Sequence, residues 1–320
     1  LIGLGNLYRE WNDDEKAMRY LERGIKLINR WGEIGAMNGY IGLAMIHKNK
    51  RDYATSQKLL KKAQELAENF DAMEFDDIMV ANYQALVSIY SGDYEYVKKW
   101  IEKRNIDPEF TPESIPSSMK LLRMVEFSTL ARFYLETDQP EKALQLLDKT
   151  CDIIKEAGWT YFELDCYLLR AVAHYKLDEF EDAIISCKKA LNLAKPASFL
   201  RMFLDFGQPM AGLLRMALEE DKISSPQDER HFSKSYAKKL IVAFNTTETA
   251  KATQGLPEPL SEREMEVLKL IADGLTNQEI GEQLFISLNT VRTHTKKINY
   301  KLDVHSRTQA ISRAKQLGIL

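Results

Sequence analysis

The chain has 320 residues, of which 45% are hydrophobic and 28% are charged, and its formal net charge is −3. These values are ordinary for a soluble globular protein, and the length suggests about two domains. No apolar run approaches the roughly 20 residues that span a membrane, and no signal peptide is present, so we expect no membrane partner and a cytoplasmic location.

A repeat occupies about the first 200 residues. Small side chains recur at Gly5, Ala44, Ala85, Ala131 and Ala171, and a second series follows twelve residues after each, at Ala17, Ser56, Val97, Ala143 and Ala183. Successive members are 39, 41, 46 and 40 residues apart in both series, with a polar turn inside each pair. The pattern resembles tetratricopeptide repeats lengthened to about forty residues, which implies stacked helix pairs that curve into a superhelix with a concave groove. Because Leu1 falls within the first predicted helix, we expect a longer parent protein.

Less regular segments follow. A Pro-rich insertion at 107–116 predicts a long loop between the third and fourth repeats. Residues 198–214 predict a helix, a break at Gly207 and a second helix, and a further helix is predicted at about 231–244. The Thr-, Gly- and Pro-containing stretch 245–259 predicts a mobile linker. We therefore expect a repeat domain at 1–244, a linker at 245–259 and a separate domain at 260–320.

The last sixty residues predict four short helices. Ser261 with Glu264, and Thr276 with Glu279, have the spacing of capping boxes that begin the first two helices. Ser287 is placed to cap a third helix, whose apolar side is Val291, Ile298 and Leu302. Ser306 with Gln309 begins a fourth. Four caps in agreement with the apolar periodicity indicate a compact helical domain.

Positive charge is concentrated on the third of these helices. Residues 287–315 contain seven Lys or Arg and one acidic residue, in a chain that is acidic as a whole. We expect the outer side of the helix to present Arg292, Thr293, Lys296, Lys297 and Lys301. A helix of this size fits the major groove of B-DNA, where Arg and Lys donate to guanine and Thr contacts a thymine methyl group.

Residues 260–320 resemble the LuxR/FixJ/NarL-type helix-turn-helix of bacterial transcription regulators. The resemblance rests on Leu260, Ser261, Arg263, Glu264, Val267, Leu268, Asn277, Glu279, Ile280, Ser287, Thr290, Val291, His294, Lys301, Leu302, Val304, Arg307 and Ala310. It implies that Arg292, Thr293 and Lys296 read bases. The expected phosphate contacts are Thr276, Asn277, Ser287, Asn289, Thr290, Lys297, Lys301 and Arg307. His294 then reads as a packed, hydrogen-bonded residue rather than a metal ligand, and Gly281 replaces the usual Ala and is expected to bring the first two helices close together.

A second resemblance covers the rest of the chain. The segment Arg201-Met-Phe-Leu-Asp-Phe-Gly-Gln-Pro-Met210, ahead of such a domain, resembles the large ATP-dependent regulators of the LuxR family. It implies a superhelical sensor preceded by a nucleotide-binding module. No Gly-x-x-x-x-Gly-Lys-Ser/Thr phosphate loop occurs in this chain, so we expect no cofactor within it and ATP, if used, upstream of Leu1.

The sensor hypothesis predicts ligand contacts on the first helix of each repeat. The groove-facing positions are expected at Asn38, Met45, Asn82, Arg132, Asp165 and Tyr175. The alternative is that these residues form an ordinary solvated surface. Cys151, Cys166 and Cys187 are widely spaced, without metal-ligand spacing, so we expect reduced cysteines and no metal site.

The sequence thus predicts an all-α protein, a TPR-like helical repeat superhelix followed by a four-helix LuxR-type helix-turn-helix domain. We expect a DNA-binding transcription regulator, not an enzyme. Its expected partners are double-stranded DNA, a small-molecule inducer or regulatory protein in the groove, RNA polymerase, and further copies of the chain on paired DNA half-sites. The alternative is a TPR-like protein-interaction scaffold with an accessory DNA-binding domain.

Overall fold

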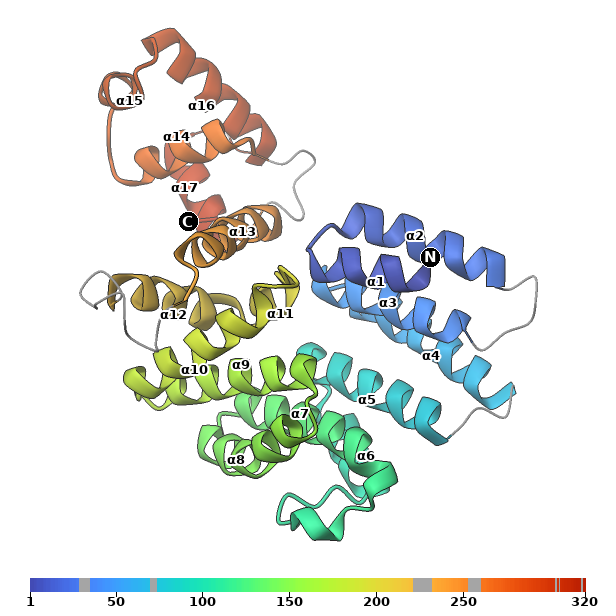
Figure 1. The fold of residues 1–320 in the computed structure, drawn as a ribbon. Coiled ribbons are helices and arrows are strands. Elements are labelled where there is room, and N and C mark those ends of the chain that lie inside the picture. The colour runs from blue at the N-terminus through green and yellow to red at the C-terminus, as the bar shows by residue number, and fades with distance from the viewer. Residues whose placement is uncertain are drawn as a thin grey trace. The chain divides into compact units, whose positions relative to one another are not determined.

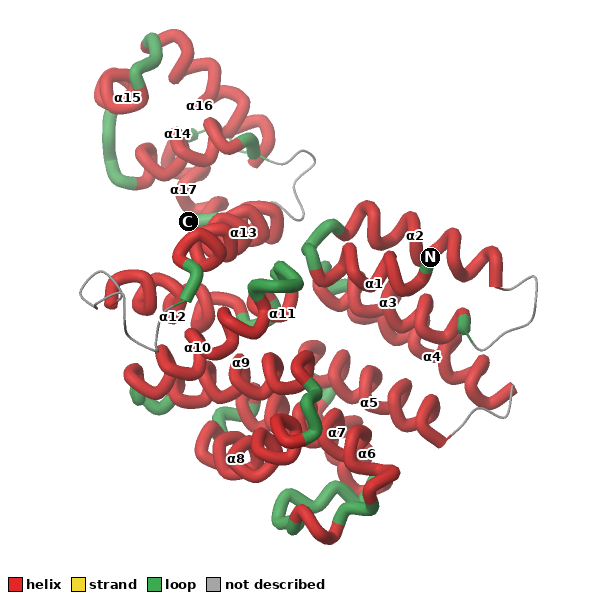
Figure 2. Tube along the Cα trace, in the orientation of Figure 1, coloured by secondary structure: helices red, strands yellow, loops and turns green. Residues whose placement is uncertain are grey.

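The computed structural model describes residues 1–28, 35–69, 74–220, 232–252, 260–302, 304, 306–317 and 319–320. Every regular element in these ranges is a helix (Figure 2), which confirms the all-α prediction. The chain divides into two compact units, Leu1–Ile241 and Val242–Leu320. We call them the repeat unit and the C-terminal unit, and treat each separately.

Five helix pairs build most of the repeat unit (Figure 1). They are α1 (Ile2–Glu10) with α2 (Asp14–Ile28), α3 (Ala36–Asn49) with α4 (Tyr53–Asn69), α5 (Glu74–Ser91) with α6 (Tyr94–Lys103), α7 (Lys120–Glu136) with α8 (Pro140–Glu156), and α9 (Thr160–Lys176) with α10 (Phe180–Ala194). One residue in the turn of each pair has a left-handed backbone, namely Asn12, Arg51, Gly92, Asp138 and Asp178. These turn residues have the same 39-, 41-, 46- and 40-residue spacing as the small residues, so each pair is closed by the same kind of turn.

The recurring small residues are buried where the two helices of a pair touch. Ala44 of α3 and Ser56 of α4 are both completely buried, and the Ser56 hydroxyl donates to the Ala44 carbonyl oxygen over 2.8 Å. In the first pair, a Cβ atom added to Gly5 would lie 2.6 Å from Cγ of Leu21. Small side chains are therefore needed for the helices to approach, as the repeat pattern predicts.

Connections outside the pairs agree in part with the sequence. The predicted loop between the third and fourth pairs contains two short 3₁₀ turns, η1 (Pro112–Ser114) and η2 (Ser117–Met119). After the fifth pair come α11 (Arg201–Leu204) and α12 (Gly207–Glu220), with Gly207 at φ 61° in the break.

The predicted linker is partly helical. Helix α13 runs from Lys234 to Ala252, eight residues beyond the expected end at Phe244. No Pro or Gly interrupts residues 245–252, and the first such residue, Gly255, lies in 253–259, outside the described residues. The division into 1–244, 245–259 and 260–320 remains a prediction.

Four helices form the rest of the C-terminal unit: α14 (Glu262–Ala272), α15 (Asn277–Leu284), α16 (Leu288–Leu302) and α17 (Arg307–Gln316). Both predicted capping boxes are present, at Ser261 with Glu264 and at Thr276 with Glu279. The buried core contains Leu260, Met265, Val267, Leu268, Ile271, Ile280, Val291, Ile298, Leu302, Ala310, Ala314 and Ile319. The caps fix where each helix begins, and this core fixes which side faces inward.

Gly281 is required for a different contact from the one that the sequence predicts. A Cβ atom at this position would lie 2.8 Å from the backbone oxygen of Ile286, in the turn between α15 and α16. The Ile286 N–H in turn donates to the Gly281 oxygen over 2.9 Å. The close approach therefore involves the α15–α16 turn, not the packing of α14 on α15.

The expectation of three reduced cysteines is wrong in this structure. Cys151 of α8 and Cys166 of α9 form a disulfide. Their Cα atoms are 6.1 Å apart, within the range that a disulfide spans, because the two helices pack side by side. Cys187 is free, and burial raises its pKa to about 12. Among the described residues, no helix combines the length and apolarity needed to cross a membrane.

Candidate nucleic-acid interface

Helix α16 is fixed at its start and along one side. The backbone N–H of Thr290 donates to Oγ of Ser287 over 3.1 Å, and the hydroxyls of the two residues lie 2.8 Å apart. Val291, Ile298 and Leu302 are buried against the other helices. The opposite side of α16 is consequently directed to solvent.

That exposed side carries the predicted base-reading residues together. Arg292, Thr293 and Lys296 are all exposed, and so is Lys297. Within the described residues, no ion pair engages Arg292, Lys296 or Lys297. Three unpaired cations on one helix give a donor surface suited to phosphates and to guanine edges.

Thr293 is limited to one kind of base contact. Its hydroxyl donates to the backbone oxygen of Asn289, one helical turn earlier, over 2.9 Å. With the hydroxyl proton used inside the helix, the residue offers its methyl group and an acceptor oxygen. The methyl group matches the C5-methyl of thymine.

Lys301 does not lie on this surface, which corrects the sequence prediction. It follows Ile298 by three residues, so it lies on the buried side of α16. Lys301 is 8% exposed, and its Nζ lies 2.9 Å from Oε2 of Glu264, which is 3% exposed. Burial alone would raise the pKa of Glu264, but the Ser261 N–H and Lys301 outweigh it, so this pKa lies below its ordinary value. Lys301 therefore joins α16 to the start of α14 and is not available for a phosphate.

The other predicted phosphate contacts differ in their exposure and in their hydrogen bonds within the protein. Thr276 and Asn289 are exposed and Asn277 is partly buried, near the starts of α15 and α16. Arg307 is partly buried, and its Nη2 donates to the backbone oxygens of Ile271 and Leu275, over 2.8 and 2.5 Å. Arg307 thus supports the α14–α15 turn, and its phosphate contact remains a prediction.

Other features of the unit were not predicted. Phe285 ends α15 with a left-handed backbone, φ 55°, and its side chain is 94% exposed. Tyr300 is also largely exposed, on α16. His294 is partly buried as expected, but its Nδ1 has no hydrogen-bond partner among the described residues, so the hydrogen-bonded reading is wrong for that atom.

The repeat unit contains a pocket of 330 Å³, which we call the concave pocket. Residues of α1, α3, α5 and α9 line it, together with Phe199. Its floor includes Ile41 and Met45, and its polar lining includes Asn38, Arg9 and Glu10. This volume falls in the range of small-molecule sites.

Glu10 holds one wall of this pocket. Its carboxylate accepts from Arg9 Nη2 over 2.5 Å and from the Tyr161 hydroxyl over 3.3 Å, and its backbone oxygen accepts the Leu200 N–H over 2.8 Å. The indole N–H of Trp11 donates to the backbone oxygen of Ala197 over 2.9 Å. Residues 197–200 therefore bind the first repeat directly, although nearly 190 residues of chain separate them.

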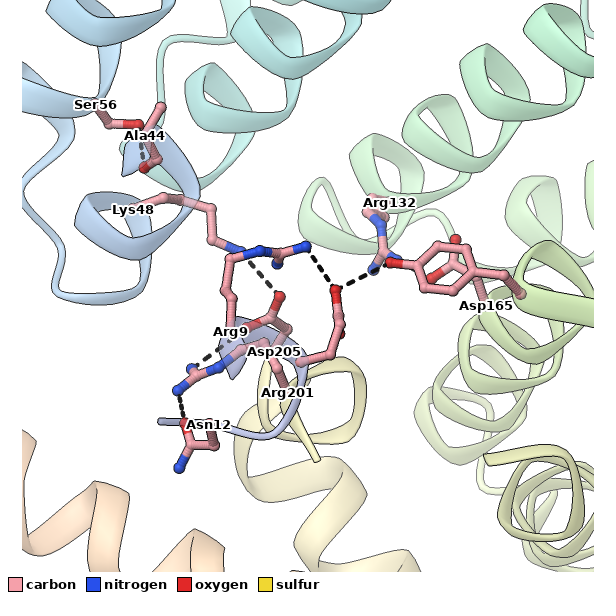
Figure 3. Close-up of polar contacts among 11 residues, drawn as sticks. Arg9, Asn12, Ala44, Lys48, Ser56, Arg132, Asp165, Arg201 and Asp205 are labelled. Carbon is pink, nitrogen blue, oxygen red and sulfur yellow. Dashed lines mark hydrogen bonds and ion pairs between the residues drawn. The ribbon is translucent and has the colours of Figure 1, made fainter. Parts of the chain in front are cut away.

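A second set of charges ties α11 to the same face. Lys48 of α3 lies 3.0 Å from the Asp205 carboxylate, and Arg201 of α11 contacts both Asp205 and Asn12 (Figure 3). Burial would raise the pKa of Asp205, but Lys48 and Arg201 outweigh it and hold this pKa below its ordinary value. The Arg201–Asp205 segment thus connects the last helices of the repeat unit to its first repeats.

The predicted ligand residues are only partly brought together. Asn38 and Met45 line the concave pocket, whereas Asn82, Arg132, Asp165 and Tyr175 are not among its lining residues. Arg132 and Asp165 pair with each other, and Asp165 also accepts the Ser128 hydroxyl. Tyr175 packs against Phe180, whose ring centre is 5.7 Å away. Arg9, Glu10, Tyr83 and Tyr161 are among the pocket residues that the sequence did not indicate.

Comparisons with known proteins cover both units. Residues 1–220 match the family model described as the MalT-like TPR region, and residues 258–314 match the one described as bacterial regulatory proteins of the luxR family. The chain is 23% identical over 330 residues to the HTH-type transcriptional regulator MalT of Vibrio campbellii, covering 96% of this chain and 34% of the relative. The transcriptional regulatory protein LiaR of Bacillus subtilis is 60% identical over 53 residues, which is 17% of this chain and 25% of LiaR.

The chain thus spans about a third of the length of the MalT relative, and the relatives named above are transcriptional regulators. The first match follows the helix pairs of the repeat unit and the second covers the helices that carry the unpaired cations. On these grounds the chain belongs to the MalT-like TPR family and carries, in its C-terminal unit, the DNA-binding domain of the luxR family of bacterial regulators.

Proposed function

We propose that this chain is the signal-receiving and promoter-binding part of a transcription regulator. The observation that carries the proposal is the exposed side of α16, where Arg292, Lys296 and Lys297 have no ion-pair partner among the described residues. Arg292 and Lys296 are one helical turn apart and read adjacent base edges, Thr293 contacts a thymine methyl, and Lys297 binds a phosphate. Catalysis is not part of the proposed role.

The repeat unit receives the signal in its concave pocket. Nε of Arg9 and Oε2 of Glu10 are buried there without a hydrogen-bond partner among the described residues. Buried polar groups without partners cost about 1–3 kcal/mol each, so a polar ligand that pairs with them binds favourably. The ligand also touches Asn38 and the Tyr161 ring, which lie next to the contacts between residues 197–205 and the first repeats. Binding therefore changes how firmly residues 197–205 are held against those repeats.

The remaining partners are part of the same proposal. Two copies of the chain bind paired half-sites, RNA polymerase is the downstream partner, and a nucleotide such as ATP is bound by a module outside these 320 residues. The competing function is a protein-interaction scaffold with an accessory DNA-binding domain. In that case the pocket residues would matter for a protein partner and DNA sequence preference would be weak.

Selection from a random pool of duplex DNA tests the DNA-binding role. The full chain is expected to enrich a short motif with thymine at the position that Thr293 meets, and the variant with Arg292→Ala and Lys296→Ala is expected to enrich none. Retention of random sequences by the full chain would favour the scaffold. The variant with Lys61→Ala and Lys142→Ala, two exposed changes on α4 and α8, serves as the matched control for loss of two positive charges.

Thermal melting of the full chain tests the sensing role. Soluble sugars are added one at a time, and one is expected to raise the melting temperature of the natural chain but not of Asn38→Ala. A shift that survives Asn38→Ala and Glu10→Gln would place the ligand elsewhere and overturn the role of the concave pocket.

A further inference from the structure

A second pocket lies away from the concave one. It has a volume of 520 Å³ and is lined by residues of α4, α5 and α6, and it shares no lining residue with the concave pocket. Helices α4 and α6 both pack on α5, so the pocket lies over α5 between its two neighbours. Its floor includes Ile78, Ala81 and the Trp100 ring.

One buried donor in this pocket has no partner. Trp100 is 4% exposed, and its indole N–H has no hydrogen-bond acceptor among the described residues. A buried N–H without an acceptor is unfavourable, and buried indole donors usually find one. A ligand with an acceptor group at this point would remove that cost.

The residues next to Trp100 on α6 add positive charge. Lys99 and Lys103 line the pocket and have no ion pair in the described parts of the chain. Together with the Trp100 N–H they give three donors within about one helical turn, since position 103 lies three residues after 100 and four after 99 and so is next to both on the helix surface. Such a set suits a carboxylate, which accepts several hydrogen bonds.

The walls from α4 and α5 carry the opposite charge. Asp77 has no ion pair among the described residues, and Glu68 ends a chain of hydrogen bonds in which Tyr96 donates to Gln84, Gln84 to Gln64, and Gln64 to Glu68, over 2.9, 3.1 and 2.9 Å. All of these residues line the pocket. The side-chain amides of Gln64 and Gln84 are thus satisfied within this chain of hydrogen bonds. The carboxylates of Asp77 and Glu68 are left to meet an ammonium group.

From this arrangement we infer that the α4–α5–α6 pocket binds an α-amino acid with an apolar side chain. The ligand carboxylate accepts from Trp100, Lys99 and Lys103, the ammonium group meets Asp77 and Glu68, and the side chain lies on Ile78 and Ala81. The volume is sufficient for an aromatic amino acid.

The test uses ¹⁹F NMR on the full chain with three probes. They are 4-fluorophenylalanine, 3-(4-fluorophenyl)propanoate, which lacks the ammonium group, and 4-fluorophenethylamine, which lacks the carboxylate. Saturable broadening is expected for 4-fluorophenylalanine, with affinity about tenfold lower for each of the other two. Equal binding of all three probes, or no binding of the first, would overturn the inference.

Two variants locate the site. Trp100→Phe keeps an aromatic ring but removes the N–H, and it is expected to weaken 4-fluorophenylalanine binding about tenfold, whereas Trp159→Phe, outside the pocket, leaves the affinity unchanged. The double change Lys99→Ala with Lys103→Ala affects only exposed side chains, so it keeps the test valid if Trp100→Phe fails to fold. It should weaken both carboxylate probes and spare 4-fluorophenethylamine. The same loss from Trp159→Phe, or none from the lysine changes, would contradict the assignment.

Discussion

The Nζ atom of Lys301 lies 2.9 Å from Oε2 of Glu264, and the same carboxylate oxygen accepts the backbone N–H of Ser261 over 2.8 Å. One buried carboxylate thus completes the cap that begins α14 and holds α16 in place. The orientation of the exposed side of α16 depends on this contact, because Lys301 lies on the opposite, buried side.

Replacing Lys301 by Met should therefore reduce stability. The change leaves the Glu264 carboxylate buried without its cation, and we expect the free energy of unfolding of the C-terminal unit to fall by about 3 kcal/mol or more. Urea denaturation followed by circular dichroism measures this. Lys297→Met is the matched control on the exposed side. It should leave stability within about 0.5 kcal/mol, weaken binding to all DNA sequences, and reduce the salt slope of binding by about 1. The reverse pattern would place Lys301 on the DNA.

The same carboxylate predicts an acid dependence. The pKa of Glu264 in the folded protein lies below its ordinary value, since Ser261 and Lys301 outweigh the effect of burial. Its stabilising effect is therefore present above the unfolded-state pKa of about 4.3 and is lost as the pH falls through the lower folded-state value. In pH-dependent denaturation, Glu264→Gln should have a smaller loss of stability below about pH 4.3 than the natural chain. If the variant loses stability with falling pH as steeply as the natural chain, Glu264 does not contribute to the acid dependence.

Thr293 allows a test of one base contact. Because its hydroxyl donates to Asn289, Thr293→Val retains the methyl group that faces the DNA and should keep the preference for thymine. Thr293→Ser removes that methyl group, and we expect it to lower discrimination at one base pair by about 1 kcal/mol or more. Competition binding with duplexes that differ at single positions measures both. Loss of the preference in Thr293→Val alone would mean that the hydroxyl, not the methyl, contacts the base.

The Cys151–Cys166 disulfide closes a loop with a sequence separation of 15 residues. Constraining an unfolded loop of that size contributes about 3 kcal/mol to stability. Reduction by dithiothreitol, or Cys151→Ser with Cys166→Ser, should lower the free energy of unfolding of the repeat unit by about that amount. Cys187→Ser is the control, and its response to dithiothreitol should equal that of the natural chain. If reduction leaves the denaturation curve in place, the disulfide does not stabilise the fold.

The helices and their order follow from local signals in the sequence. Ser261, Thr276, Ser287 and Ser306 predict the starts of four helices, because a cap depends only on residues three positions away. The spacing of small residues such as Ala44 and Ser56 predicts the helix pairs for a similar reason, since the two helices of a pair are close in the chain. The end of α13 was less predictable, because residues 245–252 contain neither a cap nor a breaker.

The candidate sites were harder to predict where contacts are distant. Arg292, Thr293 and Lys296 lie together as expected, because a helix fixes their relative positions. The burial of Lys301 was in principle readable from its spacing to Ile298, but charge alone suggested an outer position. No local signal connects Glu10 with Leu200, or Lys48 with Asp205, because their contacts depend on how the repeats curve. Of the residues predicted to face the groove, Asn38 and Met45 line the concave pocket.

The most direct test compares the affinity of the full chain for its selected duplex with that for a shuffled duplex of the same composition, at one fixed salt concentration. We predict that the natural chain prefers the selected duplex by about 10³-fold or more, and that Arg292→Ala or Lys296→Ala removes about 1–3 kcal/mol of this preference with little loss of affinity for the shuffled duplex. Equal affinities of the natural chain for the two duplexes, or a preference that both substitutions leave intact, would contradict the account.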